Sequence, residues 1–385
     1  MKITKIEALK LTLPPIKNPS KPKRQNPDRS PPHPIHIYPE FGRGRNTGVP
    51  GELGPELWVR VTAEDGSWGL GHAHWGALTV AVIREVYAPL LEGRDAFAIE
   101  FLNDLMWRAS IRFGDHGIPS MARAAIDMAL WDLKGKVLEQ PVYSLLGGPC
   151  RDHLEYYATT TDIEWAQELG FKHFKIQNLA HYTDGQPGIN ETVELVHKAR
   201  EQAGPDANLM INPVMSFNVE FAARMMEALR PYNLRWFEEP LAPWNIEGLV
   251  QLKKAVPTTP LATGETHRGR HVFREMIERR CVDMVQPDMR WTGGLTECVK
   301  IYTLAEAAGV QTIIHGGGMM AEGQHFGLAF PEHSWAEWVI FPAPGIPLEE
   351  AVRTPGVPIP KDGKVVPSSA PGFGYEILPS QLSAW

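Results

Sequence analysis

The chain has 385 residues, of which 43% are hydrophobic and 22% charged, which is typical of globular proteins and long enough for one large domain and a smaller one. The formal net charge of -7 is small for this length, so we expect a small-molecule partner, with no nucleic acid and no membrane. No apolar stretch reaches the length of a signal peptide or a membrane span, and the three cysteines lack zinc-site spacing; both observations predict a cytoplasmic protein.

The N-terminal part predicts a small antiparallel sheet interrupted by a long loop. Residues 3–13 and 56–73 are predicted strands, and Asp65-Gly66 inside the second segment is a strong hairpin-turn signal. Residues 14–52 between them are rich in Pro, Gly, Arg, Lys and His and show almost no periodic apolar pattern. Because loops of this length inside compact domains are usually lids or binding loops, we expect 14–52 to be a lid.

Apolar residues at helical spacing fill residues 80–148, and Gly147-Gly148-Pro149 marks the end of this helical region. After Arg151, short apolar strands alternate with amphipathic helices, which is typical of βαβ units and a parallel sheet. Eight such strands in succession favour a closed (β/α)8 barrel of the TIM type. The strands are YYATT, FKHFKIQ, NLMIN, LRWFEEP, PLATGE, VDMVQPD, VQTIIHG and WAEWVIF.

Polar side chains follow most of these strands at the point where each strand ends. They are Lys175 and Gln177 (second strand), Asn212 (third), Glu238 and Glu239 (fourth), Glu265 (fifth), Asp288 (sixth) and His315 (seventh), whereas Glu337 lies within the eighth strand. The carboxyl ends of barrel strands meet at one mouth, where barrel enzymes build their active sites. The sequence therefore predicts a polar site at this mouth.

Three of these residues predict a metal site. Asn212, Glu238 and Glu265 stand on consecutive strands and can offer oxygens to one hard cation, for which Mg²⁺ is the natural candidate. Glu238 and Glu239 point to opposite sides of their strand, so only one of them faces the cation, and we assign Glu238. The alternative for each carboxylate alone is an ordinary strand-end residue solvated by loops, but the three together favour one metal ion.

Asp288 and His315 follow adjacent strands and predict a general base. An aspartate carboxylate that accepts the imidazole N–H fixes the tautomer of the ring and raises its basicity. A lone His after an apolar strand is more often a core residue with a satisfied hydrogen bond. The paired Asp288 and the glycines at 316–318 beside His315 favour the catalytic interpretation.

The sequence resembles the enolase superfamily, in the branch that contains mandelate racemase and muconate lactonizing enzyme, and especially the L-rhamnonate dehydratases within it. The segments that carry the resemblance are ARAAIDMALWDLKGK, LLGG, WFEEP, ATGE, QPD with Asp288 and IIHGGG with His315. It implies an α+β capping domain formed by residues 1–150, with the lid 14–52. A barrel over 151–345 and a C-terminal segment 346–385 that packs back on the cap complete the implied fold.

The resemblance also implies roles for single residues. Asn212, Glu238 and Glu265 take the metal positions, Asp288 and His315 take those of the base dyad, and Glu337 takes that of a polar partner near the reacting oxygen. In this superfamily a Lys or His base generates an ene-diolate, and magnesium stabilises it.

Two positions depart from the pattern of the family. Asn212 replaces the usual aspartate and removes one negative charge, so we expect weaker metal binding. Lys175-Ile176-Gln177 replaces a Lys-x-Lys motif whose second lysine acts as a base, and Gln177 does not titrate. With one base only, a racemase or epimerase and a muconate-type cycloisomerase are disfavoured.

The leading hypothesis is a metal-dependent sugar-acid dehydratase that gives a 2-keto-3-deoxy sugar acid, because this reaction needs proton removal from one face only. The alternative is a degenerate sugar-acid-binding member that has lost its chemistry, which Asn212 and Gln177 together suggest. The candidates for substrate binding are His36, Arg45, Lys175 and Gln177, although a basic loop in solvent and a salt-bridged Lys175 are plain alternatives. The resemblance also implies a homo-oligomer, a dimer or an octamer.

Overall fold

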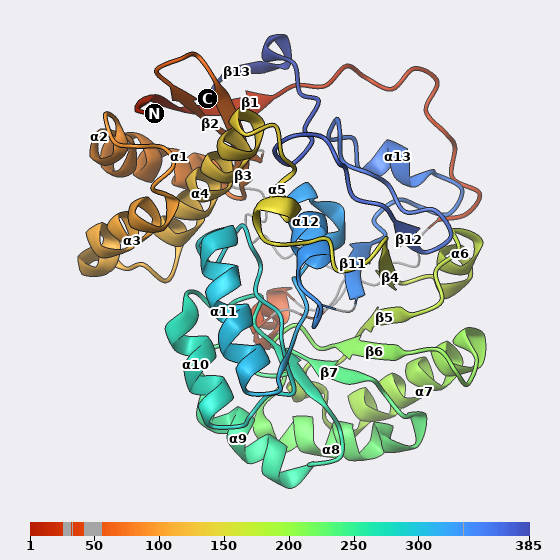
Figure 1. The fold of residues 1–385 in the computed structure, drawn as a ribbon. Helices are drawn as coiled ribbons and strands as arrows, with labels where there is room; N and C mark the ends of the chain where they lie inside the picture. The colour runs from red at the N-terminus through yellow and green to blue at the C-terminus, as the bar shows by residue number, and fades with distance from the viewer. Residues whose placement is uncertain (26–31, 33, 42–55, 334) are drawn as a thin grey trace.

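The computed structural model describes residues 1–25, 32, 34–41, 56–333 and 335–385. Figure 1 shows two parts, a small cap of strands and helices at the upper left and a larger ring of strands surrounded by helices. The predicted Arg45 and residues 26–31, 33 and 42–52 of the predicted lid 14–52 lie outside the described residues.

The cap is built on an antiparallel sheet with the strand order β13-β1-β2-β3. Its strands are β1 (Ile3–Leu11), β2 (Leu57–Ala63), β3 (Trp68–Ala73) and β13 (Leu382–Ala384). β2 and β3 form the predicted hairpin, in which the Ser67 N–H donates to the Asp65 carboxylate at 3.0 Å. Because β13 pairs with β1, both ends of the chain complete the same sheet, as the N and C labels show (Figure 1).

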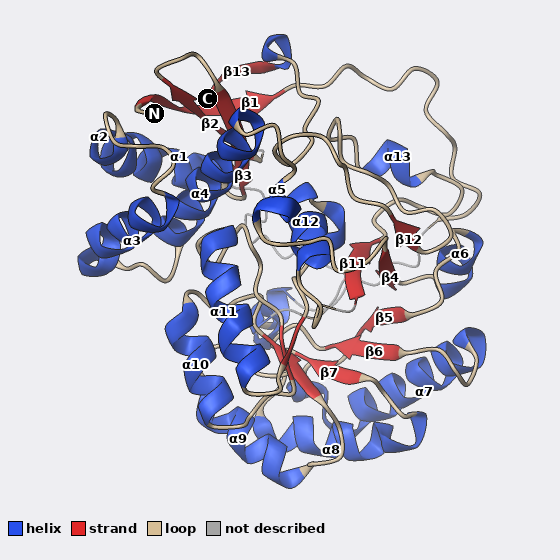
Figure 2. Cartoon of the chain, viewed as in Figure 1, coloured by secondary structure: helices blue, strands red, loops and turns tan. Residues whose placement is uncertain are grey.

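Helices cover one side of this sheet (Figure 2). They are α1 (Gly76–Val82), continued by a π-helical turn (Ile83–Tyr87), α2 (Ala88–Leu91), α3 (Ile99–Ser110), α4 (Ile118–Val137) and α5 (Val142–Leu145). α4 is the helix of the ARAAIDMALWDLKGK segment, and most of its residues are buried. A Cβ on Gly69 or Gly71 of β3 would collide with the backbone of Ala129 or Ala125, so the two glycines allow this strand to lie directly on α4.

The larger part contains the eight predicted strands, all parallel. They are β4 (Leu154–Thr159), β5 (Phe174–Gln177), β6 (Leu209–Asn212), β7 (Trp236–Glu238), β8 (Leu261–Thr263), β9 (Met284–Val285), β10 (Gln311–Thr312) and β11 (Trp335–Val339). The helices that follow them are α6 (Ile163–Glu168), α7 (Gly185–Ala203), α8 (Val219–Leu229), α9 (Ile246–Ala255), α10 (Arg270–Glu278), α11 (Leu295–Ala307) and α12 (Ala321–Ala329). The predicted fold class, a capped barrel of alternating strands and helices, is confirmed.

The curled sheet has the strand order β10-β9-β8-β7-β6-β5-β4-β11, so the last strand pairs with the first. Within the described residues no ladder joins β10 to β11. Across this seam, His333 Nδ1 lies 3.2 Å from the Thr312 carbonyl, and Glu337 accepts from the Gly316 backbone N–H at 2.8 Å. An interior cluster of Tyr157, Met210, Trp236, Ala262, Met284 and Ile313 fills the ring, and Trp335 of β11 packs against it. The ring is therefore a packed core whose polar residues lie at its mouth.

The C-terminal segment reaches both parts of the molecule. After α13 (Leu348–Ala351), β12 (Lys364–Val365) pairs antiparallel with β4 of the barrel. The chain then returns to the cap, where β13 pairs with β1. The segment thus ties the cap to the barrel through main-chain hydrogen bonds at both ends.

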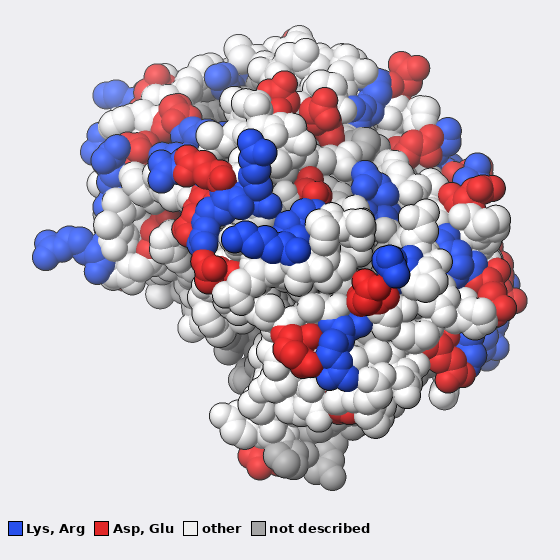
Figure 3. All heavy atoms as spheres, turned by 90° about the horizontal axis from the view of Figure 1, so that it is seen from below, with Lys and Arg blue, Asp and Glu red and all other residues white. Residues whose placement is uncertain are grey.

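Acidic and basic side chains lie side by side on the face shown in Figure 3, without a field of one sign over the whole face. This mixture agrees with the small net charge of -7. Among the described residues, no helix is both long and apolar enough to cross a membrane.

Buried polar groups join the cap to the barrel. Asp127 of α4 accepts from the Thr296 backbone N–H at 3.0 Å, and Asn103 of α3 donates to the Gly293 carbonyl at 2.9 Å. On the other side of the interface, His72 of β3 lies 3.4 Å from Glu322 of α12 through Nε2.

His72 also lies 3.0 Å from Glu56 through Nδ1, so its ring is held between two carboxylates. Burial lowers the pKa of His72, but the charges of Glu322 and Glu56 outweigh burial and raise the pKa from 6.5 to about 10. His72 is therefore a buried imidazolium at neutral pH, and it bridges the cap and the barrel.

This bridge makes stability depend on pH. The folded-state pKa is raised, so the stabilisation is fully present below pH 6.5 and is lost as pH rises through about 10. We expect His72→Gln to lower the free energy of unfolding by about 3 kcal/mol at pH 6, because it leaves the buried Glu322 without its cation. Urea unfolding from pH 6 to 10 measures this, and a variant whose deficit is the same at both ends of the range would contradict it.

Candidate active site

A cavity of about 540 Å³ lies at the mouth of the barrel, between the barrel and the cap. The barrel residues that line it include Lys175, Gln177, Asn212, Glu265, His315 and Glu337, and the cap side contributes Glu56, His72 and His74. Six of the predicted site residues thus meet at one cavity. Glu238 and Asp288 do not line it, but both contact residues that do.

The His315 and Asp288 side chains form a hydrogen-bonded pair. His315 Nδ1 lies 2.9 Å from Asp288 Oδ2, and Asp288 is fully buried. Burial alone would raise the pKa of Asp288, but Arg290 and His315 outweigh it and hold the pKa well below its usual range. The ionised Asp288 therefore accepts the Nδ1 proton, and Nε2 becomes the nitrogen that faces the other acidic residues of the site, 3.5 Å from Glu265 Oε2.

Burial lowers the pKa of His315, but Glu265, Asp288 and Glu337 outweigh burial and raise the pKa to about 10. The surroundings of this imidazole are therefore strongly acidic. The neutral His315 imidazole is therefore a strong base. A cation bound beside Glu265 would lower the pKa of His315.

Lys175 lies at the centre of a buried ion network. Its ammonium contacts Glu238 and lies 2.6 Å from Glu337, and its side chain is only 2% exposed. Glu337 also accepts from the Gly316 backbone N–H at 2.8 Å. Of the two interpretations of Lys175, the salt bridge is the one that this geometry shows.

Glu238 accepts from four side chains. Besides Lys175, the donors are Asn212 Nδ2 at 2.9 Å, Trp236 Nε1 at 2.8 Å and Gln286 Nε2 at 2.8 Å. Asn212 Oδ1 meanwhile accepts from the Val214 backbone N–H at 2.7 Å. The amide thus turns its N–H towards Glu238, whereas an aspartate in its place would repel this carboxylate unless a cation lay between them.

Glu239 and Glu265 show an excess of negative charge in the site. Glu239 is buried with Oε2 unpaired, and burial and Glu265 raise the pKa of Glu239 well above its usual range. Burial and the neighbouring Glu238 and Glu337 likewise raise the pKa of Glu265, against the pull of His315. The unpaired oxygen and the crowded carboxylates fit a divalent cation, which prefers such hard oxygen donors.

The predicted metal set contains two carboxylates and one amide. In the described part of the chain no group of three or more His, Cys, Asp or Glu side chains is arranged to hold a metal ion. Asn212 is not a residue of those four types, so this finding leaves the set Asn212, Glu238 and Glu265 as a prediction. Because one member of this set is an amide, two carboxylates supply its negative charge.

One predicted substrate residue, His36, is not brought to the cavity. His36 lies in the 3-10 turn Pro34–Ile37, which does not line it, and Arg45 lies outside the described residues. The structure instead adds residues that sequence reasoning missed, namely Glu56, His72 and His74 from the cap and Arg290 and Trp291 after β9. His72 is in β3 and His74 follows the end of this strand, and their spacing of two residues was the available signal, since residues two apart in extended chain face the same side.

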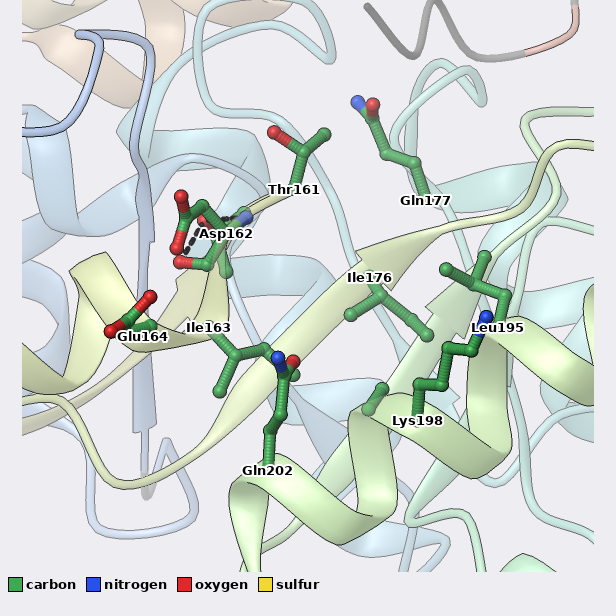
Figure 4. Close-up of a pocket in the computed structure, with 11 residues that line it drawn as sticks. Thr161, Asp162, Ile163, Glu164, Ile176, Gln177, Leu195, Lys198 and Gln202 are labelled. Atoms are coloured by element: carbon green, nitrogen blue, oxygen red, sulfur yellow. Dashed lines mark hydrogen bonds between the residues drawn. The ribbon is translucent and has the colours of Figure 1, made fainter. Parts of the chain in front are cut away.

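A second, smaller pocket of about 230 Å³ lies beside the barrel mouth between β4, α6, β5 and α7 (Figure 4). Gln177, Asp162, Glu164 and Lys198 are among its lining residues. Asp162 caps α6 by accepting from the Trp165 N–H at 2.9 Å and forms an ion pair with Arg24. Its carboxylate oxygens therefore already have partners within the fold. The larger cavity, which holds His315 of the His315–Asp288 pair, is therefore the candidate active site.

The family of the chain follows from comparison with known proteins. Residues 55–147 match the mandelate racemase / muconate lactonizing enzyme N-terminal domain, and residues 160–381 match the enolase C-terminal domain-like model. The chain therefore belongs to the enolase superfamily, in its mandelate racemase and muconate lactonizing enzyme family, and the predicted resemblance is confirmed.

Within this family the chain is similar to L-rhamnonate dehydratases. It is 35% identical to the L-rhamnonate dehydratase of Saccharopolyspora erythraea over 350 residues, 90% of this chain and 89% of the relative. The crystal structure of the L-rhamnonate dehydratase from Gibberella zeae matches with a TM-score of 0.88 and 30% identity, over 100% of this chain and 96% of that chain. The structure of the Gibberella zeae rhamnonate dehydratase complexed with Mg matches with a TM-score of 0.89 and 29% identity, over 100% and 96%.

The ion network around Lys175 gives a testable expectation. Lys175→Met leaves Glu238 and Glu337 buried beside each other without a cation, so we expect it to lower the free energy of unfolding by about 4 kcal/mol. Lys198→Met, which removes an exposed pair with Glu194, is the matched control and should change stability little. Chemical denaturation compares the two, and equal stability of both variants would show that Lys175 does not hold the mouth together.

Proposed function

We propose that this chain is a sugar-acid dehydratase that removes the proton next to the substrate carboxylate and expels the hydroxyl on the next carbon, giving a 2-keto-3-deoxy sugar acid. The observation that carries the proposal is the His315–Asp288 pair at the cavity. Gln177, which stands where a second base would be expected, lines the same cavity and does not titrate. A single base is sufficient for dehydration, whereas racemisation ordinarily needs one on each face of the carbon. The similarity to L-rhamnonate dehydratases supports the same conclusion.

Each residue of the site has a separate role in the proposed reaction. Asp288 holds the imidazole so that Nε2 takes the proton from the carbon, and the imidazolium then protonates the leaving hydroxyl. Lys175 and Glu337 form a buried ion pair with a fixed orientation beside the reacting oxygens. The proton removed and the hydroxyl expelled leave together as water, and the enol that remains becomes the 2-keto acid when its third carbon is protonated.

Asn212, Glu238 and Glu265 would hold one Mg²⁺ ion, with Glu239 as a further carboxylate in the same acidic region. When bound, the ion supplies a Lewis acid for the negative charge that develops on the substrate carboxylate. Its charge would also offset the excess of carboxylates that raises the pKa of Glu265.

A sugar-acid-binding protein without catalysis is the second candidate. The observation that favours it is the saturation of Glu238 by Lys175, Asn212, Trp236 and Gln286, which leaves this carboxylate satisfied without a metal ion. Binding of a sugar acid without formation of a 2-keto acid would identify this function.

Turnover tests the first candidate. We expect the protein with Mg²⁺ to convert at least one member of a panel of aldonic and aldaric acids to a 2-keto acid, and His315→Asn to lower kcat about 1000-fold, because the base is lost. His197→Asn, which changes an exposed histidine of α7, should leave kcat unchanged. A 2-keto-acid assay measures both, and turnover by His315→Asn at the wild-type rate would rule out the proposed base.

A separate prediction concerns Asn212, the last residue of β6. Asn212→Asp adds a negative charge beside Glu238 and should tighten Mg²⁺ binding about tenfold, since ligand charge sets the affinity of such sites. Asn208→Asp, at the beginning of the stretch that forms β6 and thus at the opposite end of the barrel, is the control. Calorimetric titration with MgCl₂ compares the three proteins, and equal affinities would place the ion elsewhere.

A further inference from the structure

Trp291 follows β9 of the barrel, but its side chain packs against the hydrophobic core of the cap. Its indole is stacked on that of Trp75, the residue before α1, with the ring centroids 5.6 Å apart and 20° between the ring planes. Its backbone carbonyl accepts from the hydroxyl of Ser120 in α4 at 2.6 Å. The cap therefore holds both the side chain and the main chain of this barrel residue.

The same indole contacts the proposed base. Its centroid lies 5.5 Å from that of the His315 imidazole, with 44° between the ring planes. The guanidinium of Arg268 lies over the indole at 5.1 Å, and Trp291 Nε1 donates to His74 Nδ1 at 3.3 Å. The indole thus has neighbours on several sides, and it links the cap to His315.

The hydrogen bond to Asp288 alone does not fix the plane of the His315 imidazole. It joins His315 Nδ1 to Asp288 Oδ2 at 2.9 Å, so it holds one ring atom and lets the ring tilt about that atom. The torsion that sets the plane of an imidazole has broad minima, and packing decides its value. The Trp291 indole beside the ring removes part of this freedom and thereby fixes where Nε2 points.

Trp291 and Asp288 also belong to one turn of the main chain. The Trp291 and Thr292 N–H groups donate to the Asp288 carbonyl at 3.0 and 2.9 Å. The next residues are held to the cap, since Asn103 donates to the Gly293 carbonyl at 2.9 Å. A shift of the cap against the barrel would therefore move both the indole and the carboxylate that contact the proposed base.

We infer that the cap orients the proposed base through Trp291, and that Trp75 and Trp291 are positioning residues for proton removal. The inference rests on the proposed function, since His315 is the base of that reaction. Trp75 is not among the described residues that line the cavity, so its effect on the reaction has to pass through its neighbours. Trp291 does line the cavity, and its variants are therefore tested for substrate binding as well as for rate.

The first arm of the test measures kcat and KM with Mg²⁺ for the best sugar acid of the panel, carrying hydrogen or deuterium at its second carbon. Trp291→Leu removes the aromatic face, so we expect kcat to fall about 30-fold with KM within about twofold, because a small displacement of a reacting group costs mainly rate. The deuterium isotope effect on kcat should be at least as large as in the wild type, since the slowed step is proton removal. Trp291→Phe keeps an aromatic ring and should retain kcat to within about threefold.

The outcomes of this arm separate the inference from the proposed function. A rise in KM without loss of kcat would make Trp291 a substrate contact and would overturn the inference alone. An unchanged kcat, or an isotope effect near one in Trp291→Leu, would also overturn the inference alone, because proton removal would then not depend on the indole. No turnover of any acid by the wild type would overturn the proposed function and this inference together.

The second arm tests whether the cap acts through Trp291. Trp75→Leu removes the stacked partner of the indole, so we expect kcat to fall about tenfold with KM unchanged. In the Trp291→Leu background the same substitution should cost less than about twofold, since the effects of residues that act through one another are not additive. Trp385→Leu, which changes the residue after β13 in the cap and leaves the cavity lining intact, is the control and should change neither constant.

Thermal unfolding confirms that each variant is folded. Trp75→Leu decides the question if Trp291→Leu does not fold, because the same loss of kcat and the same isotope effect are expected of it. A wild-type kcat in Trp75→Leu would overturn the inference. A loss of kcat that is equally large in both backgrounds would overturn it too, since the cap would then act on the reaction without Trp291.

Discussion

Asp288 is the side chain on which the site depends, because one buried carboxylate serves two neighbours. It fixes His315 through Nδ1 at 2.9 Å and holds Arg290 through Nη2 at 3.0 Å. A carboxylate buried this completely stays ionised only when it is paired, and here both partners are present. The orientation of the proposed base and the position of the cap-facing guanidinium are therefore set by the same residue.

Several buried carboxylates gather at the mouth of the barrel, and among the described residues Lys175 is in direct contact with two of them. Lys175 neutralises part of the charge of Glu238 and Glu337, but Glu239 and Glu265 remain, and their raised pKa values reflect this excess. Such an arrangement is costly for folding alone, and it becomes favourable when a divalent cation or a protonated base lies among the carboxylates. The acidic character of the site thus agrees with the proposed function.

The barrel, the hairpin and the gathering of the strand-end residues could be predicted from the sequence, because each depends on local periodicity and on the parallel direction of the strands. Asp288 and His315 are an example, since adjacent strands bring them together. The partners of Lys175 could not be fixed, because a long side chain reaches whichever carboxylates the packing leaves nearest. His74 and Arg290 could not be paired either, since their contact is made across two parts of the fold separated by more than 200 residues.

Turnover in D₂O, followed by NMR, tests the claim of a single-base dehydratase most directly. A single-base dehydratase gives a 2-keto-3-deoxy acid that carries one deuterium at its third carbon, and the remaining substrate keeps its configuration at the second carbon. Accumulation of the epimer at the second carbon, with deuterium there, would require a base on the opposite face and would rule out a single-base enzyme.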